Sequence, residues 1–382
     1  MIRPLEGVRI LAVEQYGAGP YGTQLLAELG AEVVKIEAPS MGGDVSRQTG
    51  PYFLGENDSL FFQTFSRGKK SLALEIKSAE GRAAFDDLVR GADAVVNNLR
   101  GDQPEKLKIT FAHLRAINPK IVCAHLSAYG RDNPRAAWPG YDYLMQAEAG
   151  FLSMTGEPDG PPVRCGVSII DFHTGSQFAV GILAAILRAQ RTGEGCDVDV
   201  SLYDVALHQL SYPATWYLNE GVSTGRLPRG AHPSIAPSQL FQTADGWMML
   251  MCQTPKFWER FCELVGREDL KSDMRFAAIP DRRKNLADLT QTLDAILQGR
   301  TTADWMALLG GEVPCAPVYD IAEALDNPFA RAVGMIDRPD HPDAQNGVRM
   351  LACPIKIDGQ RMPAARAPKL GEHNRAFLEP SS

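Results

Sequence analysis

The chain has 382 residues, of which 45% are hydrophobic and 22% are charged, and its formal net charge at pH 7 is −7. This length predicts two or three domains, because one folding unit usually spans about 100–200 residues. The negative charge argues against nucleic acid or an anionic membrane as the main partner, although a local basic site can still hold an anionic ligand. The N-terminus lacks a secretory apolar region and no stretch approaches the ~18 apolar residues of a membrane span, so we expect a cytoplasmic protein.

The first two hundred residues alternate between short apolar strands and helices of moderate length. We expect helices at residues 21–30 and 79–90, and strands at residues 8–13, 32–37, 71–76, 94–98 and 121–126. This alternation is typical of parallel βαβ units whose sheet is covered on both faces. The pattern predicts an α/β fold with a Rossmann-like large domain, and a ligand crevice at the carboxyl ends of its strands.

Residues 17–22, GAGPYG, fit the G-x-G-x-x-G pattern of dinucleotide-binding loops, since they follow a strand and precede a helix. Glu37 ends the next strand about twenty residues later, which completes the pattern formally. However, Pro20 removes a backbone N–H group that a pyrophosphate needs, and no residues for hydride transfer follow. We therefore predict a nucleotide-type crevice without a nicotinamide and keep a dehydrogenase as an alternative.

Residues 97–101, NNLRG, end another expected strand and put amides and a guanidinium at the edge of the same crevice. With Lys106 and Lys108 on the following segment, this region suits a phosphate-bearing or amide-rich ligand. A second basic patch lies at residues 67–70. Ordinary solvated surface loops explain both patterns equally well.

Residues 166–175, GVSIIDFHTG, place Asp171 between an expected apolar strand and an apolar helix over residues 174–191. An aspartate at a helix start usually caps free backbone N–H groups. The same geometry suits catalysis, because the helix dipole and free amides stabilise a carboxylate anion and Gly175 allows a ligand to approach.

The seven cysteines are scattered, with no Cys-x-x-Cys pair and no histidine at ligand spacing. This distribution suggests neither a zinc site nor a disulfide framework. Cys165 lies six residues before Asp171, but an apolar cysteine there is more typical of packing than of a nucleophile. We expect no metal and no permanently bound cofactor.

A change in composition divides the chain. Residues 221–237 contain three prolines and three glycines and predict a linker after a large domain over residues 1–220. Residues 238–325 are expected to form a smaller α+β domain, and residues 326–382 to return to the large domain. The small domain should contain a hairpin at residues 240–252 and helices at residues 256–265, 283–297 and 302–309; a helix near 321–325 and a strand pair around 348–357 should follow.

These motifs, in this order, resemble the class III coenzyme A transferases, also called the CaiB/BaiF family, over nearly the whole chain. The motifs are PLEGVRILAVEQYGAGPYGTQLLAELGAEVVKIE at 4–37, GDVSR at 43–47, SLALEIK at 71–77, VVNNLRGDQPEKL at 95–107, INPKIVCAHLSAYG at 117–130, GYDYLMQAEAG at 140–150, TGEPDGPPVRCGVSIIDFHTG at 155–175, ADGWMML at 244–250 and PKLGEHN at 368–374.

The resemblance implies that CoA moves from an acyl-CoA thioester to a carboxylic acid through covalent aspartyl intermediates, a mixed anhydride and an aspartyl-CoA thioester. It implies that Asp171 is the nucleophile. It also implies a homodimer of two interlocked rings, with acyl-CoA and small carboxylic acids as substrates. Implied CoA contacts are Gly17, Ala18, Leu74, Lys77, Asn98, Leu99, Arg100, Lys106, Gly140, Tyr141 and Asp142.

Two departures from the family pattern concern specificity. Ala38 stands where many members carry an arginine, so one phosphate or adenine contact is missing or replaced. Residues 229–233, RGAHP, replace the glycine-rich loop of formyl-CoA transferases, which argues against formyl and oxalyl specificity.

Two alternatives stay open. The related 2-methylacyl-CoA racemases use a His-Asp pair for α-proton transfer, but Tyr141 stands at the histidine position and needs a large pKa shift to replace it. His125 and His173 are other candidate bases. A non-catalytic CoA-binding protein is the third possibility, and there a substitution of Asp171 leaves every activity unchanged.

Overall fold

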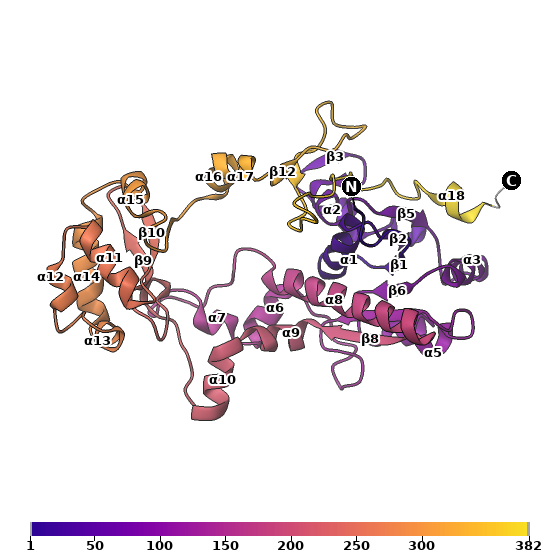
Figure 1. The fold of residues 1–382 in the computed structure, drawn as a ribbon. Helices are drawn as coiled ribbons and strands as arrows, with labels where there is room; N and C mark the ends of the chain where they lie inside the picture. The colour runs from indigo at the N-terminus through magenta and orange to yellow at the C-terminus, as the bar shows by residue number, and fades with distance from the viewer. Residues whose placement is uncertain (1, 380–382) are drawn as a thin grey trace. The chain divides into compact units, whose positions relative to one another are not determined.

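The computed structural model describes residues 2–379 and divides into two compact units (Figure 1). Unit 1 contains the residues up to 149, residues 166–211, and the chain from 328 onward. Unit 2 contains residues 150–165 and 212–327. Each unit is described by itself below.

Unit 1 is built on one sheet of six parallel strands in the order β5-β2-β1-β6-β7-β8. From β1 the chain runs outward to one edge and then restarts at β6 toward the other edge, so the strand order reverses between β1 and β6. A ligand crevice forms at such a point, beside the carboxyl ends of the strands. The strands are β1 (Arg9–Val13), β2 (Glu32–Glu37), β5 (Lys70–Ala73), β6 (Ala94–Asn97), β7 (Val122–Ser127) and β8 (Cys196–Ser201).

The sheet is buried on both faces, as its continuous apolar strands predict. On one face, Leu11 and Val95 pack with Phe85 and Val89 of α3 (Ala79–Arg90) in a core without solvent exposure. Helices α1 (Ala18–Glu28) and α8 (Ile169–Thr192) pack closely against each other, and α8 also contacts β7 and β8. The α/β class and the parallel sheet are confirmed.

Strand β8 is absent from the sequence-based expectation. Its sequence, CDVDVS, alternates between aspartate and valine, and its burial alternates in the same way. It lies at the edge of the sheet, where only one neighbouring strand pairs with it. An edge strand of this kind lacks the continuous apolar run by which the other strands are recognised.

The 24-residue helix α8 is long and apolar enough to cross a membrane by length and composition, contrary to the expectation that no segment is. It is the one such helix among residues 2–379. Phe178, Ile182 and Ile186 on its inner face are buried in unit 1. A core helix has the same composition, so the apolar length alone indicates burial as readily as membrane insertion.

Unit 1 contains further short elements that support this framework. They are η1 (Pro39–Met41), η2 (Val45–Gln48), β3 (Phe53–Gly55), β4 (Asp58–Ser59), α2 (Leu60–Ser66), α4 (Gln103–Lys106), α5 (Phe111–Leu114), α6 (Asp142–Glu148), α9 (Leu202–Gln209), α17 (Pro328–Ala332), β12 (Ile336–Asp337), β13 (Met350–Leu351) and α18 (Asn374–Leu378). The strand pair expected around 348–357 is instead β13 paired with β12.

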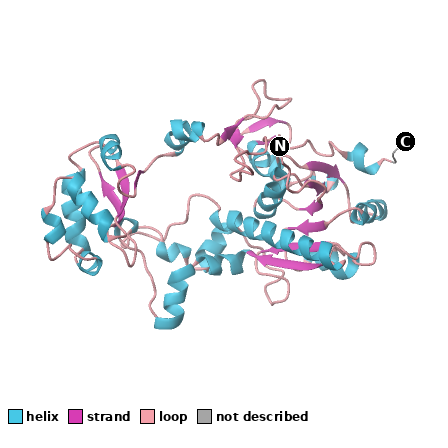
Figure 2. Cartoon of the chain, in the orientation of Figure 1, coloured by secondary structure: helices cyan, strands magenta, loops and turns pink. Residues whose placement is uncertain are grey.

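Unit 2 combines helices with a three-stranded antiparallel sheet in the order β11-β10-β9 (Figure 2). The expected hairpin is present as β9 and β10. The expected helix over 283–297 is two helices, because Asn285 leaves the helical conformation between them. The elements are α7 (Phe151–Met154), α10 (Ser211–Glu220), η3 (Pro228–Gly230), β9 (Ser238–Gln242), β10 (Trp247–Met251), α11 (Pro255–Leu264), α12 (Asp269–Ser272), α13 (Ile279–Lys284), α14 (Leu286–Leu297), α15 (Thr302–Leu309), β11 (Cys315–Pro317) and α16 (Ile321–Asp326).

The boundaries of the two units differ from the expected ones. Residues 150–165 and 212–220 belong to unit 2, although they were assigned to the large domain. The expected linker at 221–237 also lies within unit 2, where Arg229 donates to both carboxylate oxygens of Asp294 on α14. A proline- and glycine-rich composition marks irregular backbone, and here that backbone is anchored in the unit.

The final segment returns to unit 1, and buried polar contacts attach it. The Arg47 guanidinium donates to Pro368 O at 3.1 Å and also pairs with Glu37. Asn374 accepts a hydrogen bond from Ala73 N on β5, at 2.9 Å. The segment is therefore part of the large unit rather than a tail.

Candidate functional site

A cavity of about 370 Å³ opens at the carboxyl end of the unit 1 sheet, where the strand order reverses. Its walls come from the loops that follow β1, β6 and β7, together with one side chain of α8. The lining residues are Gln15, Tyr16, Gly17, Ala18, Asn98, Leu99, Arg100, Gln103, Leu126, Ser127, Ala128, Trp138, Pro139, Gly140, Tyr141, Asp171 and Leu202.

Asp171 projects into this cavity from the first turn of α8. The helix begins at Ile169 after the N-cap Ser168, so the strand expected before Asp171 is wrong. The apolar run of Ile169 and Ile170 resembles a strand, but it forms the first turn, with Ile170 fully buried. Within residues 2–379 the Asp171 carboxylate has no hydrogen-bond or ion-pair partner, so it does not cap the helix.

Asp142 on α6 caps the helix instead. Its Oδ2 accepts hydrogen bonds from Ile170 N at 2.7 Å and Asp171 N at 2.9 Å, and its Oδ1 accepts one from Gln146 Nε2 at 2.5 Å. The expectation that the first amides of this helix are free is therefore wrong for these two groups. The Asp142 carboxylate is buried and occupied by bonds within the chain, so its known contacts are structural.

Burial and the nearby Asp142 charge raise the pKa of Asp171 to about 7. The sequence-based expectation was the opposite, namely that the helix N-terminus stabilises the anion. The difference arises because the amides that would do so already bond the Asp142 carboxylate. A partly buried carboxylate without partners is poorly solvated, and such a group is a stronger nucleophile than one in water.

Glycines in the loop after β1 allow the close approach of Asp171. A Cβ atom on Gly17 would lie 2.9 Å from Asp171 Oδ2, and one on Gly19 would lie 2.7 Å from the Cβ of Asn98. A Cβ on Gly22 would lie 2.4 Å from the carbonyl oxygen of Gly175, so α1 and α8 touch through their backbones. These three glycines of the GAGPYG motif therefore have packing roles around the carboxylate.

The acidic residue of the dinucleotide pattern is not available to a ribose. Both Glu37 carboxylate oxygens pair with the Arg47 guanidinium at 2.7 and 2.8 Å, and Glu37 also accepts from Ser71 Oγ at 2.6 Å. Glu37 is 3% exposed. The motif thus coincides with the dinucleotide fingerprint in sequence while its acidic group has a structural role.

Asn98 joins two walls of the cavity. Its Nδ2 donates to Gln15 O at 2.7 Å, and its Oδ1 accepts from Gln15 N at 2.8 Å. The loop after β6 is thereby fixed to the loop after β1. The neighbouring Arg100 is half-exposed, and its Nε lies 3.6 Å from Asp102 Oδ1.

The cavity unites most of the predicted site residues. It contains Asp171 and seven of the expected CoA contacts, which are Gly17, Ala18, Asn98, Leu99, Arg100, Gly140 and Tyr141. Four others lie outside its lining. Leu74 is in the core beside α3, Lys77 follows β5, Lys106 pairs with Asp102 at 2.5 Å, and Asp142 caps α8. Their contact with CoA stays a prediction.

Sequence reasoning missed several lining residues, among them Tyr16, Ser127 and Trp138. Tyr16 is a non-glycine residue with φ +70°, a conformation that no sequence signal announces. Trp138 lies two positions before Gly140, so its place beside that motif is a signal by which it could have been predicted. Its ring is half-exposed and packs edge-on against Tyr129.

The two histidines considered as racemase bases do not line the cavity. His125 is buried, with one ring nitrogen 2.7 Å from Asn97 Nδ2 and the other 2.8 Å from an Asp197 oxygen. His173 lies on α8, 3.4 Å from Gln177 Nε2. Because no imidazole is among the cavity residues, the racemase alternative lacks its base in the described part of the chain.

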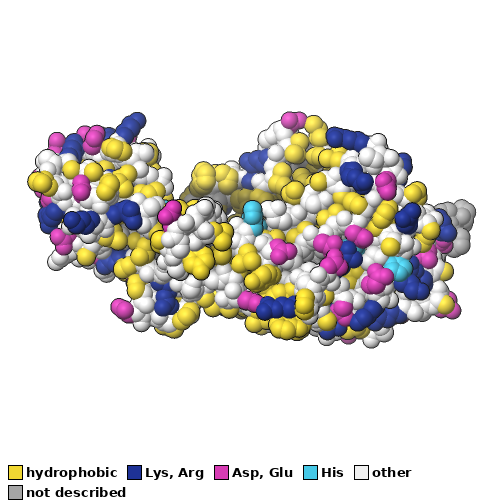
Figure 3. Space-filling model, turned by 90° about the horizontal axis from the view of Figure 1, so that it is seen from below, with side chains coloured by type: hydrophobic (Ala, Val, Ile, Leu, Met, Phe, Trp, Pro, Cys, Tyr) yellow, Lys and Arg dark blue, Asp and Glu magenta, His cyan; other side chains and the backbone are white. Residues whose placement is uncertain are grey.

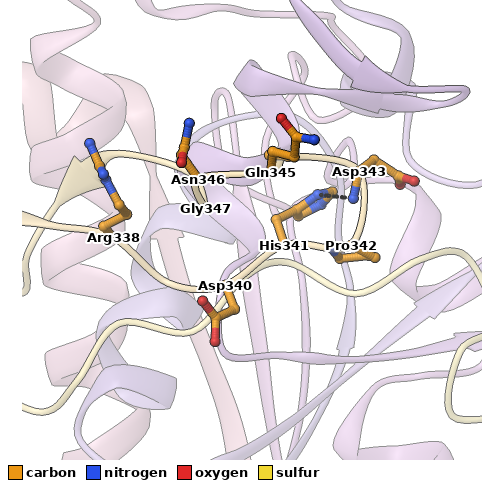
Figure 4. Close-up of a pocket in the computed structure, with 9 residues that line it drawn as sticks. Arg338, Asp340, His341, Pro342, Asp343, Gln345, Asn346 and Gly347 are labelled. Carbon is orange, nitrogen blue, oxygen red and sulfur yellow. Dashed lines mark hydrogen bonds between the residues drawn. The ribbon is translucent and has the colours of Figure 1, made fainter.

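A second polar cluster lies where the returning segment meets β4 (Figure 4). Asp58, His341 and Asp343 have the donor types and spacing that can hold a metal ion. However, His341 Nε2 pairs with Asp58 at 2.9 Å, its Nδ1 accepts from Asp343 N, and Lys369 pairs with Asp343 at 3.0 Å. The polar groups of this cluster therefore already have partners within the chain, and their contacts attach the returning segment to unit 1.

Comparisons with known proteins agree with this geometry. The model of CoA-transferase family III matches residues 5–374. The succinyl-CoA:mesaconate CoA-transferase of Haloarcula hispanica is 35% identical over 98% of this chain and 96% of its own, and the acetyl-CoA:oxalate CoA-transferase of Acetobacter aceti is 34% identical over 98% and 95%. The crystal structure of a CaiB/BaiF family protein from Brucella suis superposes with a TM-score of 0.85 and 32% identity, covering 98% of both chains. With a carboxylate in the switch-point cavity and full-length similarity to such enzymes, this chain belongs to the class III CoA-transferases, the CaiB/BaiF family.

Proposed function

We propose that this enzyme transfers CoA from an acyl-CoA thioester to a carboxylic acid through covalent intermediates on Asp171. The observation that supports this most directly is the Asp171 carboxylate itself, which faces the cavity, lacks partners in the described chain, and has its pKa raised to about 7. A carboxylate held in a poorly solvated site can attack a thioester carbonyl.

The reaction balances without an outside reagent. An Asp171 oxygen attacks the thioester carbonyl, the C–S bond breaks, and a mixed anhydride and CoA thiolate form. The thiolate then attacks the Asp171 carbonyl, which releases the first acid as its carboxylate and leaves an aspartyl-CoA thioester. The acceptor carboxylate attacks this thioester, and the freed thiolate attacks the acceptor's acyl carbon, which gives the new acyl-CoA and regenerates Asp171.

Each addition places negative charge on an oxygen, which needs hydrogen-bond donors. Ile170 N and Asp171 N bond Asp142, so we propose other donors. Helix α1 begins at Ala18, which lines the cavity, and has no side-chain cap, so the backbone N–H groups of Ala18 and Gly19 are our candidate donors. The backbone around Gly140 supplies the opposite wall.

The substrates we propose are an acyl-CoA and a short dicarboxylic acid. Both relatives above are named for acceptors of this kind, mesaconate and oxalate. Arg100 is the one lysine or arginine among the cavity residues and is our candidate for an anionic group of CoA. Lys106, the last residue of the short helix α4, is the second candidate for this contact.

Trapping the intermediate tests this proposal. The protein is incubated with succinyl-CoA or acetyl-CoA, quenched with hydroxylamine, and digested for mass spectrometry. A hydroxamate is expected on the peptide that bears Asp171, because only an activated acyl carboxylate reacts in this way. Asp171→Asn should abolish both the label and the transfer, whereas Asp87→Asn, at an exposed position on α3, should change neither.

A label on another residue would move the nucleophile elsewhere. Rapid exchange of the α-proton in deuterated water, without an acceptor acid, would instead indicate racemase chemistry. Full retention of transfer in Asp171→Asn would contradict the mechanism.

We also propose that the enzyme is a cytoplasmic homodimer, with the interlocked rings that the family resemblance implies. Side chains on the outer face of α8 support association, since Val180 is 62% exposed and Leu187 is 51% exposed. Figure 3 shows hydrophobic side chains at the surface on the face seen from below. Sedimentation at micromolar concentration should give twice the chain mass, and a monomer would contradict the proposal.

A further inference from the structure

The backbone of Tyr16 is held in an unusual conformation at the edge of the cavity. Its φ of +70° is in the left-handed region, which is unfavourable for a non-glycine residue. Tyr16 N donates to Asp44 Oδ1 at 3.1 Å, and the Asn98 amide bonds both backbone groups of Gln15. The surrounding structure therefore imposes this conformation.

A buried ion pair supports the same loop from below. Asp44 Oδ2 lies 2.7 Å from Lys35 Nζ, which also donates to Glu14 O at 2.9 Å. The Lys35 and Asp44 side chains are both without solvent exposure. Burying two charges costs several kcal/mol of desolvation before their attraction is counted. The ends of this ion pair bond the backbone at Glu14 and Tyr16, so it fixes the residues that lead into the cavity.

The side chain of Tyr16 is directed by aromatic packing. Its ring centroid lies 4.9 Å from that of Phe61, and it meets Tyr141 edge-on at 6.5 Å. The ring is 38% exposed and lines the cavity together with Asp171. Burial and the Asp171 charge raise the pKa of the Tyr16 phenol, so the group is a protonated hydrogen-bond donor at neutral pH.

We propose that Tyr16 determines acid specificity, its phenol O–H donating a hydrogen bond to the second carboxylate of a dicarboxylic acid whose first carboxylate reacts at Asp171. This assignment rests on the proposed function and names the residue that selects the acid. Arg100 is the one cationic side chain in the lining, and it lies on the loop after β6, toward Ala137. The Tyr16 phenol lines the same cavity as the Asp171 carboxylate and is our candidate donor for the far end of a short diacid.

The test compares wild type with Tyr16→Phe, which removes one oxygen and keeps the ring that packs on Phe61. Acceptors are paired by length: oxalate with acetate, using succinyl-CoA as donor, and succinate with butyrate and glutarate with valerate, using acetyl-CoA as donor, so that no acceptor is the donor's own acid. We expect kcat/KM for the preferred diacid to fall roughly 10- to 100-fold, the range for a hydrogen bond to a charged group. The value for the paired monoacid and the Kd for free CoA should change less than about threefold.

Tyr52→Phe is the matched control, because Tyr52 is 69% exposed and does not line the cavity. An unchanged diacid-to-monoacid ratio in Tyr16→Phe overturns the assignment, as does an equal loss for both acids. A wild-type enzyme that transfers CoA without preferring any diacid also overturns it and leaves the aspartyl mechanism standing. Absence of all transfer by wild type overturns both.

Discussion

Two carboxylates, Asp142 on α6 and Asp171 on α8, have opposite roles at the start of α8. Asp142 accepts hydrogen bonds from the first amides of α8, while burial and the charge of Asp142 raise the pKa of Asp171. Asp171 needs to ionise in order to attack a carbonyl. The same residue, Asp142, therefore fixes the start of α8 and influences the protonation of Asp171.

This coupling predicts the pH dependence of turnover. The acid limb of kcat/KM should have a midpoint near pH 7, the pKa to which burial and Asp142 raise Asp171. Asp142→Asn removes the like charge and retains an oxygen for the two amides, so the midpoint should move to lower pH. The measurement is kcat/KM from pH 5 to 9 for both proteins. An unmoved acid limb would exclude this electrostatic coupling.

The same pKa predicts an effect on stability. The folded pKa of Asp171 lies above its usual value, so the native state binds more protons than the unfolded state between the two values. Asp171 therefore lowers the free energy of unfolding as pH rises toward 7, and the cost is fully present above pH 7. Asp171→Asn should stabilise the protein by about 1–3 kcal/mol at pH 8 and much less at pH 4.

Thermal or denaturant-induced unfolding of wild type and Asp171→Asn, measured at pH 4 and at pH 8, gives this difference in stability. The control is Asp87→Asn, whose melting temperature should follow that of wild type at each pH. A lower melting temperature for Asp171→Asn at pH 8 would show that burial does not strain the carboxylate.

At this scale the sequence predicted Asp171 and seven other residues that line the cavity, because those positions carry motifs. It did not reveal the role of Asp142 or Tyr16. Asp142 acts on an amide 28 positions away, and Tyr16 depends on bonds to Asp44 and on a neighbour fixed by Asn98. Contacts between distant segments leave no mark on local patterns.

At the scale of elements, the backbone contact between α1 and α8 sets the place of Asp171. The two helices approach through Gly22 and Gly175, where an added Cβ would meet Gly22 N or the Gly175 carbonyl oxygen at 3.0 Å or less. Helix α1 also has an N-terminus without a side-chain cap, and its first residue, Ala18, lines the same cavity as Asp171. The spacing of these two helices therefore sets the spacing of nucleophile and amides.

Gly22→Ala should separate the helices and misplace the nucleophile. We expect a loss of about 1–3 kcal/mol in stability, the usual cost of overpacking, with a fall in kcat larger than any rise in KM for acyl-CoA. Gly91→Ala is the control, since its Cβ would meet only the flexible end of Arg9, at 3.4 Å. Wild-type kcat in a stable Gly22→Ala protein would show that this contact does not position Asp171.

Element types were more predictable than their limits. The apolar strands of the sheet and most helices follow from periodicity, whereas the start of α8 was placed about one turn late. Ile169 and Ile170 are β-branched and favour strands locally, but the Asp142 cap makes them helical. The break at Asn285 was likewise missed, because the apolar pattern continues on both sides of it.

At the scale of the whole molecule, both units are assembled from segments separated in the chain. Unit 1 is completed by the residues after 327, and unit 2 takes in residues 150–165. The return of the last segment was expected because its strands are too few for a core. The contribution of residues 150–165 was not, since nothing in their composition distinguishes them from a loop of the large domain.

The contacts of Arg47 lead to a prediction about how firmly the returning segment is attached to the rest of unit 1. It is 1% exposed, pairs with Glu37, and bonds Pro368 O. Arg47→Ala leaves a buried carboxylate unpaired, so we expect a loss of about 3–5 kcal/mol. Limited proteolysis should then cleave between residues 328 and 379 many times faster than in wild type. Arg375→Ala, at a 91% exposed side chain, should not change the rate, and equal rates in both variants would contradict the role of Arg47.

The capped start of α8 also has a consequence for the energy profile of the reaction. In the resting enzyme, the carboxylates of Asp142 and Asp171 lie near each other at the start of α8. In the proposed mechanism, an anhydride or thioester bond to Asp171 removes its charge, so Asp142 bonds the helix amides without a like charge beside it. Covalent modification in this mechanism would therefore relieve the repulsion between the two carboxylates. Relief of this repulsion lowers the free energy of the covalent intermediates. Their free energies therefore lie nearer to those of the states before and after them.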